Sequence, residues 1–142
     1  MKRAFLFFAV LGAALSCGTN TEVEPQLTIT QGLYGQLTKR CTPAGCVGAP
    51  LEGAPVGWFD RSPFPGDGGV RPTPVHDLVS GKNGFYELAI DSNARGYLAI
   101  GQASATEGVI WVTATATTVP RGLGRIDWYA GPDNDGTWTD VR

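Results

Sequence analysis

The chain has 142 residues, of which 17% are charged, and it contains 20 glycines and 10 prolines. This composition is typical of short strands joined by many turns, and it argues against a helical bundle and against a disordered chain. The formal net charge of −2 argues against nucleic acid as a partner, because proteins that bind nucleic acid carry a basic surface.

The first sixteen residues have the pattern of a secretory signal peptide. Lys2 and Arg3 form a basic start, and a 12-residue apolar run follows over residues 4–15 (AFLFFAVLGAAL). This run is too short to cross a bilayer as a helix, which needs about 20 residues. We therefore expect residues 1–16 to be removed. The remaining 126 residues have the size of one domain, and their 9 basic and 13 acidic residues give a net charge of about −4.

A cysteine lies directly after the expected cleavage site. The segment Ala14-Leu15-Ser16-Cys17 resembles the lipobox of bacterial lipoproteins, in which the cysteine receives a diacylglycerol before signal peptidase II cuts. The resemblance implies that acyl chains on Cys17 anchor the protein to a membrane, at about 0.8 kcal/mol per buried CH₂. Gly18, in place of an aspartate, resembles the sorting signal for the outer membrane, if the bacterium has two membranes. An ordinary signal peptide with an incidental cysteine is the alternative.

Two further cysteines remain for the folded part, which we expect over residues 27–142 after a polar, flexible tether over residues 17–26. In an exported chain, a pair such as Cys41 and Cys46 is interpreted as a disulfide. The alternative, a zinc site, needs four ligands, whereas the chain has one histidine, His76, and no further thiol. We therefore expect no metal and no cofactor.

From Leu27 onward, alternation of period two dominates, and no stretch of ten residues keeps a helical period. Strands are expected, in chain order, over residues 33–38, 55–60, 75–79, 85–90, 96–100, 109–117, 125–129 and 137–141. Residues 61–74 read as a Pro/Gly-rich loop, and Asn83-Gly84 and residues 132–136 as turns. This spacing predicts a single antiparallel β-sandwich without a helix longer than two turns.

In each alternating strand, one set of side chains should face the core, because successive residues point to opposite faces of a sheet. After Gly84 we expect the more apolar set to be inward, namely Tyr86, Leu88 and Ile90. In the longest strand, the inward set expected is Ile110, Val112 and Ala114, and the competing set is Val109, Trp111 and Thr113.

A family resemblance is carried by four segments: residues 34–37 (YGQL), 50–56 (PLEGAPV), 80–88 (SGKNGFYEL) and 96–100 (GYLAI). They resemble the carboxypeptidase regulatory-like domains, which share the transthyretin-like (prealbumin-like) β-sandwich fold. The resemblance covers about half of the chain and implies a fold together with a role as a surface-attached accessory or interaction module, often without catalysis. The segment between Cys41 and Cys46, the Pro/Gly-rich loop and a C-terminal hairpin rich in tryptophan depart from the family pattern.

Three motifs have both a functional and a structural interpretation. His76, Asp77 and Ser80 contain the residue types of a catalytic triad, but no Gly-x-Ser-x-Gly marks the serine, and we expect a histidine at a strand edge. The segment 133–136 (DNDG) begins like a calcium loop, although the same residues are common in hairpin turns. Trp128 and Trp138 are expected opposite each other across that turn, as a packing pair or as a platform for sugar stacking.

The sequence therefore predicts a non-catalytic, lipid-anchored protein of the cell envelope that acts as an interaction or accessory module. Its partners would be a membrane, through acyl chains on Cys17, and an envelope protein or polysaccharide. The alternative function is a carbohydrate-binding module that uses exposed tryptophans, with Trp128 and Trp138 as ligand-binding residues. Because the chain lacks an identifiable nucleophile, base or metal cluster, we do not expect an enzyme.

Overall fold

The structure is a computed structural model that describes residues 26–39, 49–66, 68–130 and 138–141. The strands in these segments are β1 (Gly32–Lys39), β2 (Pro55–Phe59), β3 (His76–Val79), β4 (Phe85–Leu88), β5 (Arg95–Ser104), β6 (Gly108–Thr118), β7 (Leu123–Arg125), β8 (Asp127–Ala130) and β9 (Trp138–Val141). The helical element found among them is a 3₁₀ turn at Lys82–Gly84. The expected dominance of strands over helices is confirmed. Within the described segments, no helix has the length and apolar character needed to span a membrane.

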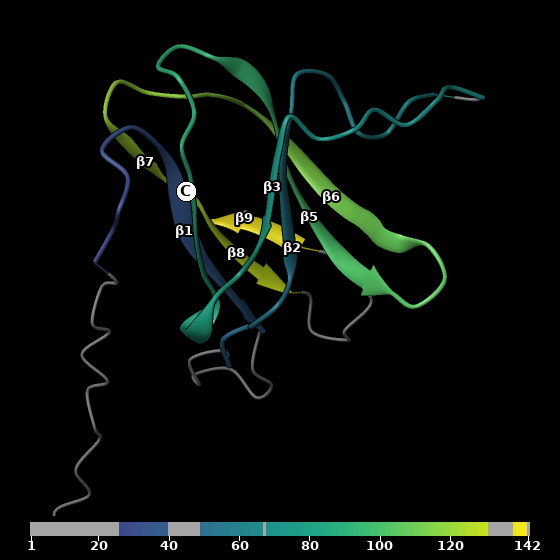
Figure 1. The fold of residues 1–142 in the computed structure, drawn as a ribbon, viewed down its shortest axis with the longest axis horizontal. Coiled ribbons are helices and arrows are strands. Elements are labelled where there is room, and N and C mark those ends of the chain that lie inside the picture. Colours follow the sequence, from purple (N-terminus) through teal and green to yellow (C-terminus); the bar gives the residue numbers. More distant parts are fainter. Residues whose placement is uncertain (1–25, 40–48, 67, 131–137, 142) are drawn as a thin grey trace, which may run out of the picture.

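The strands form two sheets (Figure 1). The first has the order β4-β1-β8-β9, with β7 also beside β1, and the second has the order β3-β2-β5-β6. The prediction of an all-antiparallel arrangement is wrong at one place, because β1 pairs in parallel with both β7 and β8. β1 lies inside the first sheet, with the antiparallel β4 on one side and with β7 and β8, which run in the same direction as β1, on the other.

One buried cluster contains residues of both sheets, so the core lies between them. Its largest fully buried side chains include Leu33 and Leu37 from β1, Leu98 and Ile100 from β5, and Trp128 from β8. The expected inward set of β4 is confirmed, since Tyr86, Leu88 and Ile90 are 3%, 3% and 7% exposed. The Tyr86 hydroxyl donates a hydrogen bond of 2.6 Å to the Ile126 carbonyl, so its one buried polar atom has a partner.

The expected inward set of β6 is wrong. Thr113 and Thr115 pair with the core residues Ile100 and Leu98, so they face the core and Ala114 faces outward. The pairing then shifts by one residue between Ile100 and Gly101, and Trp111 also faces outward, where its ring meets that of Phe59 edge-on at 5.1 Å. A β-bulge therefore interrupts the alternation, and no single period-two set of β6 can be inward.

The turn before β4 requires glycine. Asn83 and Gly84 have φ angles of 62° and 74°, in the left-handed region that favours asparagine and glycine. A Cβ atom on Gly84 would lie 2.1 Å from the Leu37 carbonyl oxygen. The predicted turn at Asn83-Gly84 is thus confirmed, and its tight approach to β1 fixes the start of β4.

Candidate functional site

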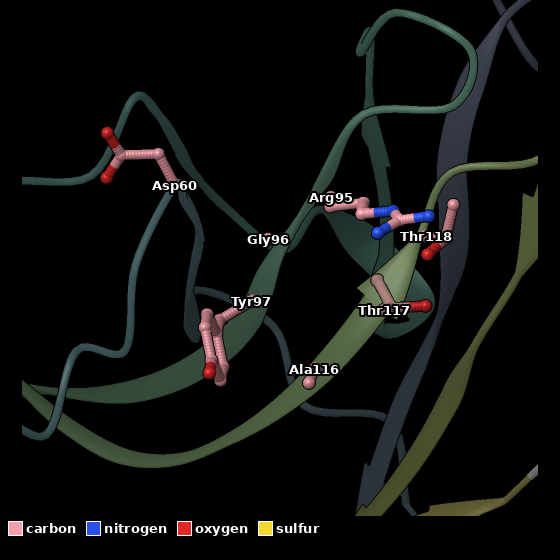
Figure 2. Close-up of a pocket in the computed structure, with 7 residues that line it drawn as sticks. All are labelled: Asp60, Arg95, Gly96, Tyr97, Ala116, Thr117 and Thr118. Atoms are coloured by element: carbon pink, nitrogen blue, oxygen red, sulfur yellow. The ribbon is translucent and has the colours of Figure 1, made fainter.

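A groove of about 620 Å³ lies at one end of the second sheet, where β2 ends, β5 begins and β6 ends. The residues that line it come from these three strand ends (Figure 2): Asp60, Arg95, Gly96, Tyr97, Ala116, Thr117 and Thr118. Antiparallel pairing brings them together, because Tyr97 pairs with Ala116 and Arg95 pairs with Thr118. The groove is therefore built on paired backbone and not on a loop alone.

The lining combines an aromatic ring with polar groups of both signs. Figure 2 shows Asp60 and Tyr97 projecting to one side and Arg95 with Thr117 to the other. Asp60 and Arg95 are exposed and make no ion pair or side-chain hydrogen bond within the described residues. The groove thus offers an acceptor, a donor, two hydroxyls and a half-buried ring to a ligand.

The glycine in this lining has a steric reason. Gly96 lies between Arg95 and Tyr97, and a Cβ atom there would come within 2.6 Å of the Trp58 indole and 2.3 Å of the Phe59 carbonyl oxygen. The core tryptophan therefore fills the space directly beneath the groove. This packing supports the backbone that carries Arg95 and Tyr97.

The outward face of the second sheet continues from the groove as an apolar surface. Phe59, the other cross-strand partner of Tyr97, is fully buried on this side, and Trp111 packs against it. Gly57 makes room for that tryptophan, because a Cβ atom there would lie 2.6 Å from its ring. This face of the sheet is consequently partly covered and partly open beside Tyr97.

The segment that enters the domain from the expected tether is held at the same end of the molecule (Figure 1). The Gln31 side-chain amide donates hydrogen bonds to the carbonyls of Ile90 at 3.2 Å and Pro120 at 3.0 Å, and its oxygen accepts one from the Gly122 N–H at 2.8 Å. Ile90 lies in the loop that leads to Arg95, and Pro120 follows the end of β6. One side chain therefore clamps both loops next to the groove.

A second contact holds the same segment to β4. The Thr28 hydroxyl and backbone N–H donate hydrogen bonds of 2.5 and 2.9 Å to the Glu87 carboxylate. These bonds stabilise the charged form, so they lower the pKa of Glu87 from its ordinary value of 4.5. Glu87 is half-exposed and faces away from the core, as expected from the alternation of β4.

The tryptophan pair expected from the sequence is not formed as predicted. The register pairs Trp128 with Asp140 and Ala130 with Trp138, a shift of two residues from direct opposition. Trp128 is 1% exposed and belongs to the core, so it has the packing role and offers no surface to a sugar. Its Nε1 atom has no hydrogen-bond partner among the described residues.

His76 and Ser80 have separate surroundings. Ser80 is 2% exposed, and its hydroxyl donates to the Leu51 carbonyl at 2.5 Å and accepts from the Ala54 N–H at 2.9 Å. His76 begins the edge strand β3 and is exposed, as predicted. Four residues of extended chain separate the two, which corresponds to about 13 Å. The serine therefore ties β3 to the segment before β2.

The remaining predicted positions, Cys17, Cys41, Cys46 and residues 133–136, lie outside the described residues. The flanks of the segment that contains two of these cysteines do meet. The Lys39 N–H donates to the Ala49 carbonyl at 2.7 Å, and Thr38 forms a β-bridge with Pro50. Within the described segments, no three His, Cys, Asp or Glu residues are grouped as metal ligands would be.

The groove was missed at the sequence level because its residues come from three separate strand ends. Asp60, Arg95 and Tyr97 are common residue types, and their proximity follows from strand pairing between distant segments. In the sequence, the Gly-Tyr pair at residues 96–97 indicates only the start of a strand. Gly96, which the packing of Trp58 requires next to the half-buried Tyr97, was the one local signal available.

No family model, no curated protein and no solved structure matches the chain. Its function must therefore be inferred from its own residues and their geometry.

Proposed function

We propose that the chain is a non-catalytic, lipid-anchored protein of the bacterial envelope that acts as an interaction or accessory module. The observation that carries the proposal is the groove at the ends of β2, β5 and β6. It presents Asp60 and Tyr97 toward one side and Arg95 toward the other, at the ends of three strands of one sheet, without internal ion pairs among the described residues. Such a combination suits binding of a polar partner by hydrogen bonds and ring contacts.

The signal-like N-terminus and the lipobox-like segment at Cys17 support the anchor. Gln26 lies nine positions after Cys17, and an extended chain of this length spans at most about 30 Å. The Gln31 clamp then joins the tether to the groove end of the domain. In the anchored protein, the groove would be held near the membrane surface, where it meets partners bound to the same envelope layer.

The finer fold proposed is the transthyretin-like sandwich of the carboxypeptidase regulatory-like domains. Three of the four segments that resemble this family coincide with parts of strands β1, β4 and β5. The fourth, residues 50–56, leads into β2. The structural use of the Ser80 hydroxyl supports the non-catalytic role. The meeting of Lys39 with Ala49 supports a disulfide between Cys41 and Cys46.

The anchor is tested by intact-mass analysis of protein extracted from membranes. The expected species begins at Cys17 and carries diacylglycerol, and Cys17→Ser should abolish the modification. An unmodified Cys17 or a retained Met1 would show that the anchor is wrong.

The binding role of the groove is tested by cross-linking in intact cells. Tyr97→Ala should remove the cross-linked partner by weakening contact in the groove. Tyr129→Ala is the matched control, because Tyr129 is a 36% exposed tyrosine of the other sheet. A partner pattern that is unchanged by Tyr97→Ala, or lost equally in both variants, would contradict the assignment of the groove.

Carbohydrate binding is the second candidate function, and the groove favours it in a changed form. The ring of Tyr97, flanked by Asp60, Arg95 and the threonine hydroxyls, replaces the tryptophan platform expected from the sequence. Purified protein would be sedimented with insoluble peptidoglycan and with other envelope polysaccharides. Binding that Tyr97→Ala removes and Tyr129→Ala preserves supports this function, and absence of binding to every polysaccharide contradicts it.

A further inference from the structure

Asp60 and Arg95 lie at neighbouring strand ends of the groove and do not pair with each other. Arg95 directly precedes Gly96, and Asp60 directly follows Phe59, whose carbonyl oxygen would lie 2.3 Å from a Cβ atom on Gly96. Both side chains are exposed, and neither takes part in an ion pair or a side-chain hydrogen bond among the described residues. Figure 2 shows them projecting in opposite directions. The groove therefore has one negative and one positive side chain that are both available to a ligand.

The backbone around Arg95 is held by the end of β6. The Asn93 N–H donates a hydrogen bond to the Val119 carbonyl at 2.8 Å, and the Val119 N–H donates one to the Ala94 carbonyl at 2.9 Å. Val119 is fully buried, and Arg95 pairs with Thr118 in the ladder between β5 and β6. Because this backbone is already ordered, a ligand that contacts Arg95 orders only its side chain, which limits the entropy cost of binding.

The two sides of the groove suit ligand groups of opposite charge. On one side, an ammonium group would be attracted by the Asp60 carboxylate and by the negative face of the Tyr97 ring. On the other side, the Arg95 guanidinium has the planar set of donors that fits a carboxylate, and the hydroxyls of Thr117 and Thr118 can donate further hydrogen bonds. A ligand with one charge would leave the opposite side of the groove without a partner, whereas a ligand with both charges satisfies both sides.

The opposite placement of the two charges also limits the kind of ligand that carries both. In a free amino acid, the ammonium group and the carboxylate are bonded to the same carbon atom, so they cannot face two opposite sides of a groove. In a short peptide, the two groups are separated by about 3.3–3.6 Å for each residue of extended chain. The groove volume of about 620 Å³ lies within the usual range for sites that bind small ligands. A peptide of a few residues therefore fits the groove better than a single amino acid or a neutral sugar.

We propose that the groove binds a short peptide that carries a free ammonium group and a free carboxylate. The ammonium group would lie beside Asp60 and Tyr97, and the carboxylate beside Arg95. The Tyr97 ring would also pack against the aliphatic part of the peptide between its two charges. This inference rests on the proposed function, because it names the class of ligand for the same groove.

The test is an NMR titration of the mature protein, in mild detergent, with the tripeptide alanyl-leucyl-alanine. The expected result is a saturable change in the amide signals of Gly96 and Tyr97. Acetylation of the amino end of the peptide and amidation of its carboxyl end should each raise the dissociation constant about fivefold or more, because each removes one of the two charged contacts.

Two substitutions connect each charge of the peptide with one side chain. Asp60→Asn should weaken binding of the free peptide about as much as acetylation does, and acetylation should then have no further effect. Arg95→Gln should have the same relation to amidation of the carboxyl end. Asp77→Asn and Arg71→Gln are the matched controls, since both side chains are exposed and neither lines the groove. The controls should leave the dissociation constant unchanged, and circular dichroism should show the same fold in all four variants.

Binding that is absent, that persists when both ends of the peptide are blocked, or that falls equally in the control variants would overturn the proposal. So would a saturable change with phosphatidylethanolamine added to the detergent micelles, whose headgroup also carries both charges, in place of a change with the peptide. Each of these results leaves the groove to its own test, because the loss of a cross-linked partner in Tyr97→Ala is measured in cells without added peptide. A partner that is unaffected by Tyr97→Ala would instead contradict the proposed function.

Discussion

Strands β4 and β6 belong to different sheets and place their side chains in different ways. In β4 and the residue pair after it, Tyr86, Leu88 and Ile90 are all buried, and Glu87 between them is half-exposed. In β6 the same alternation is interrupted, so that Trp111 and Ala114 both face outward although they are three residues apart. The comparison shows that period two identifies a buried face only within one uninterrupted ladder of strand pairs.

The largest effect is expected from truncation of the inward set of β4. Leu88→Ala should lower the free energy of unfolding by about 2–5 kcal/mol, because it removes buried apolar area and leaves a cavity. Urea denaturation measures the change. An effect no larger than that of Glu87→Ala would mean that Leu88 is not among the inward-facing side chains of β4.

Trp111→Ala tests the outward face of β6. The ring packs against Phe59 but is only partly buried, so we expect a loss of about 1–3 kcal/mol, below that of a fully buried tryptophan. Thermal unfolding of the variant and of Phe59→Leu would show whether the two rings act together. A change of less than about 0.5 kcal/mol, the usual scale of surface substitutions, would contradict the packing of Trp111 on this face.

Cys41→Ser should have a smaller effect, at most about 2 kcal/mol, because a disulfide between Cys41 and Cys46 closes a very short loop. The measurement is unfolding of the oxidised protein with and without the substitution. Mass analysis after alkylation without reduction is the control. If both thiols react with iodoacetamide in protein from the envelope, the disulfide is absent.

The smallest effect is expected at Glu87, and it should depend on pH. Glu87→Ala removes the two hydrogen bonds from Thr28, which lie at an exposed position and contribute about 1 kcal/mol or less. Since the pKa of Glu87 is lowered in the folded protein, the contribution is present above the unfolded pKa and is lost as the pH falls through the folded value. The difference between wild type and Glu87→Ala should therefore shrink below about pH 4.5. A stability difference between wild type and Glu87→Ala that is constant from pH 7 to pH 3 would contradict this role of the Glu87 carboxylate.

Much of the strand order along the chain was predictable from local sequence. The turn at Asn83-Gly84 and the core set after it follow from backbone preferences and alternation that involve neighbouring residues only. The bulge in β6 was not predictable in this way, because it depends on how β6 pairs with Gly101 of β5. The predicted pairing of Trp128 with Trp138 is wrong for a similar reason. A shift of two residues between β8 and β9 leaves the same side chains on each face, so the alternation of the sequence cannot distinguish the two pairings.

The candidate site was less predictable than the fold. Its residues are brought together by the pairing of β2 with β5 and of β5 with β6, which places Asp60 near Arg95 and Thr118, 35 and 58 positions later in the sequence. The parallel pairing of β1 with β7 and β8 was missed because a single chain gives no local signal for a strand that returns to the middle of a sheet. Each of these features is set by contacts between distant elements.

The position of β1 also determines how the domain would respond to a pull on its N-terminus. β1 lies between β4 on one side and β7 and β8 on the other, and the chain enters it directly after Gln31. Tension along the strand would load its backbone hydrogen bonds in shear, all at once, because these bonds run across the strand direction. An edge strand pulled outward would instead open one bond at a time. A domain that is held through the N-terminal end of β1 is therefore built to stay folded under tension along that strand.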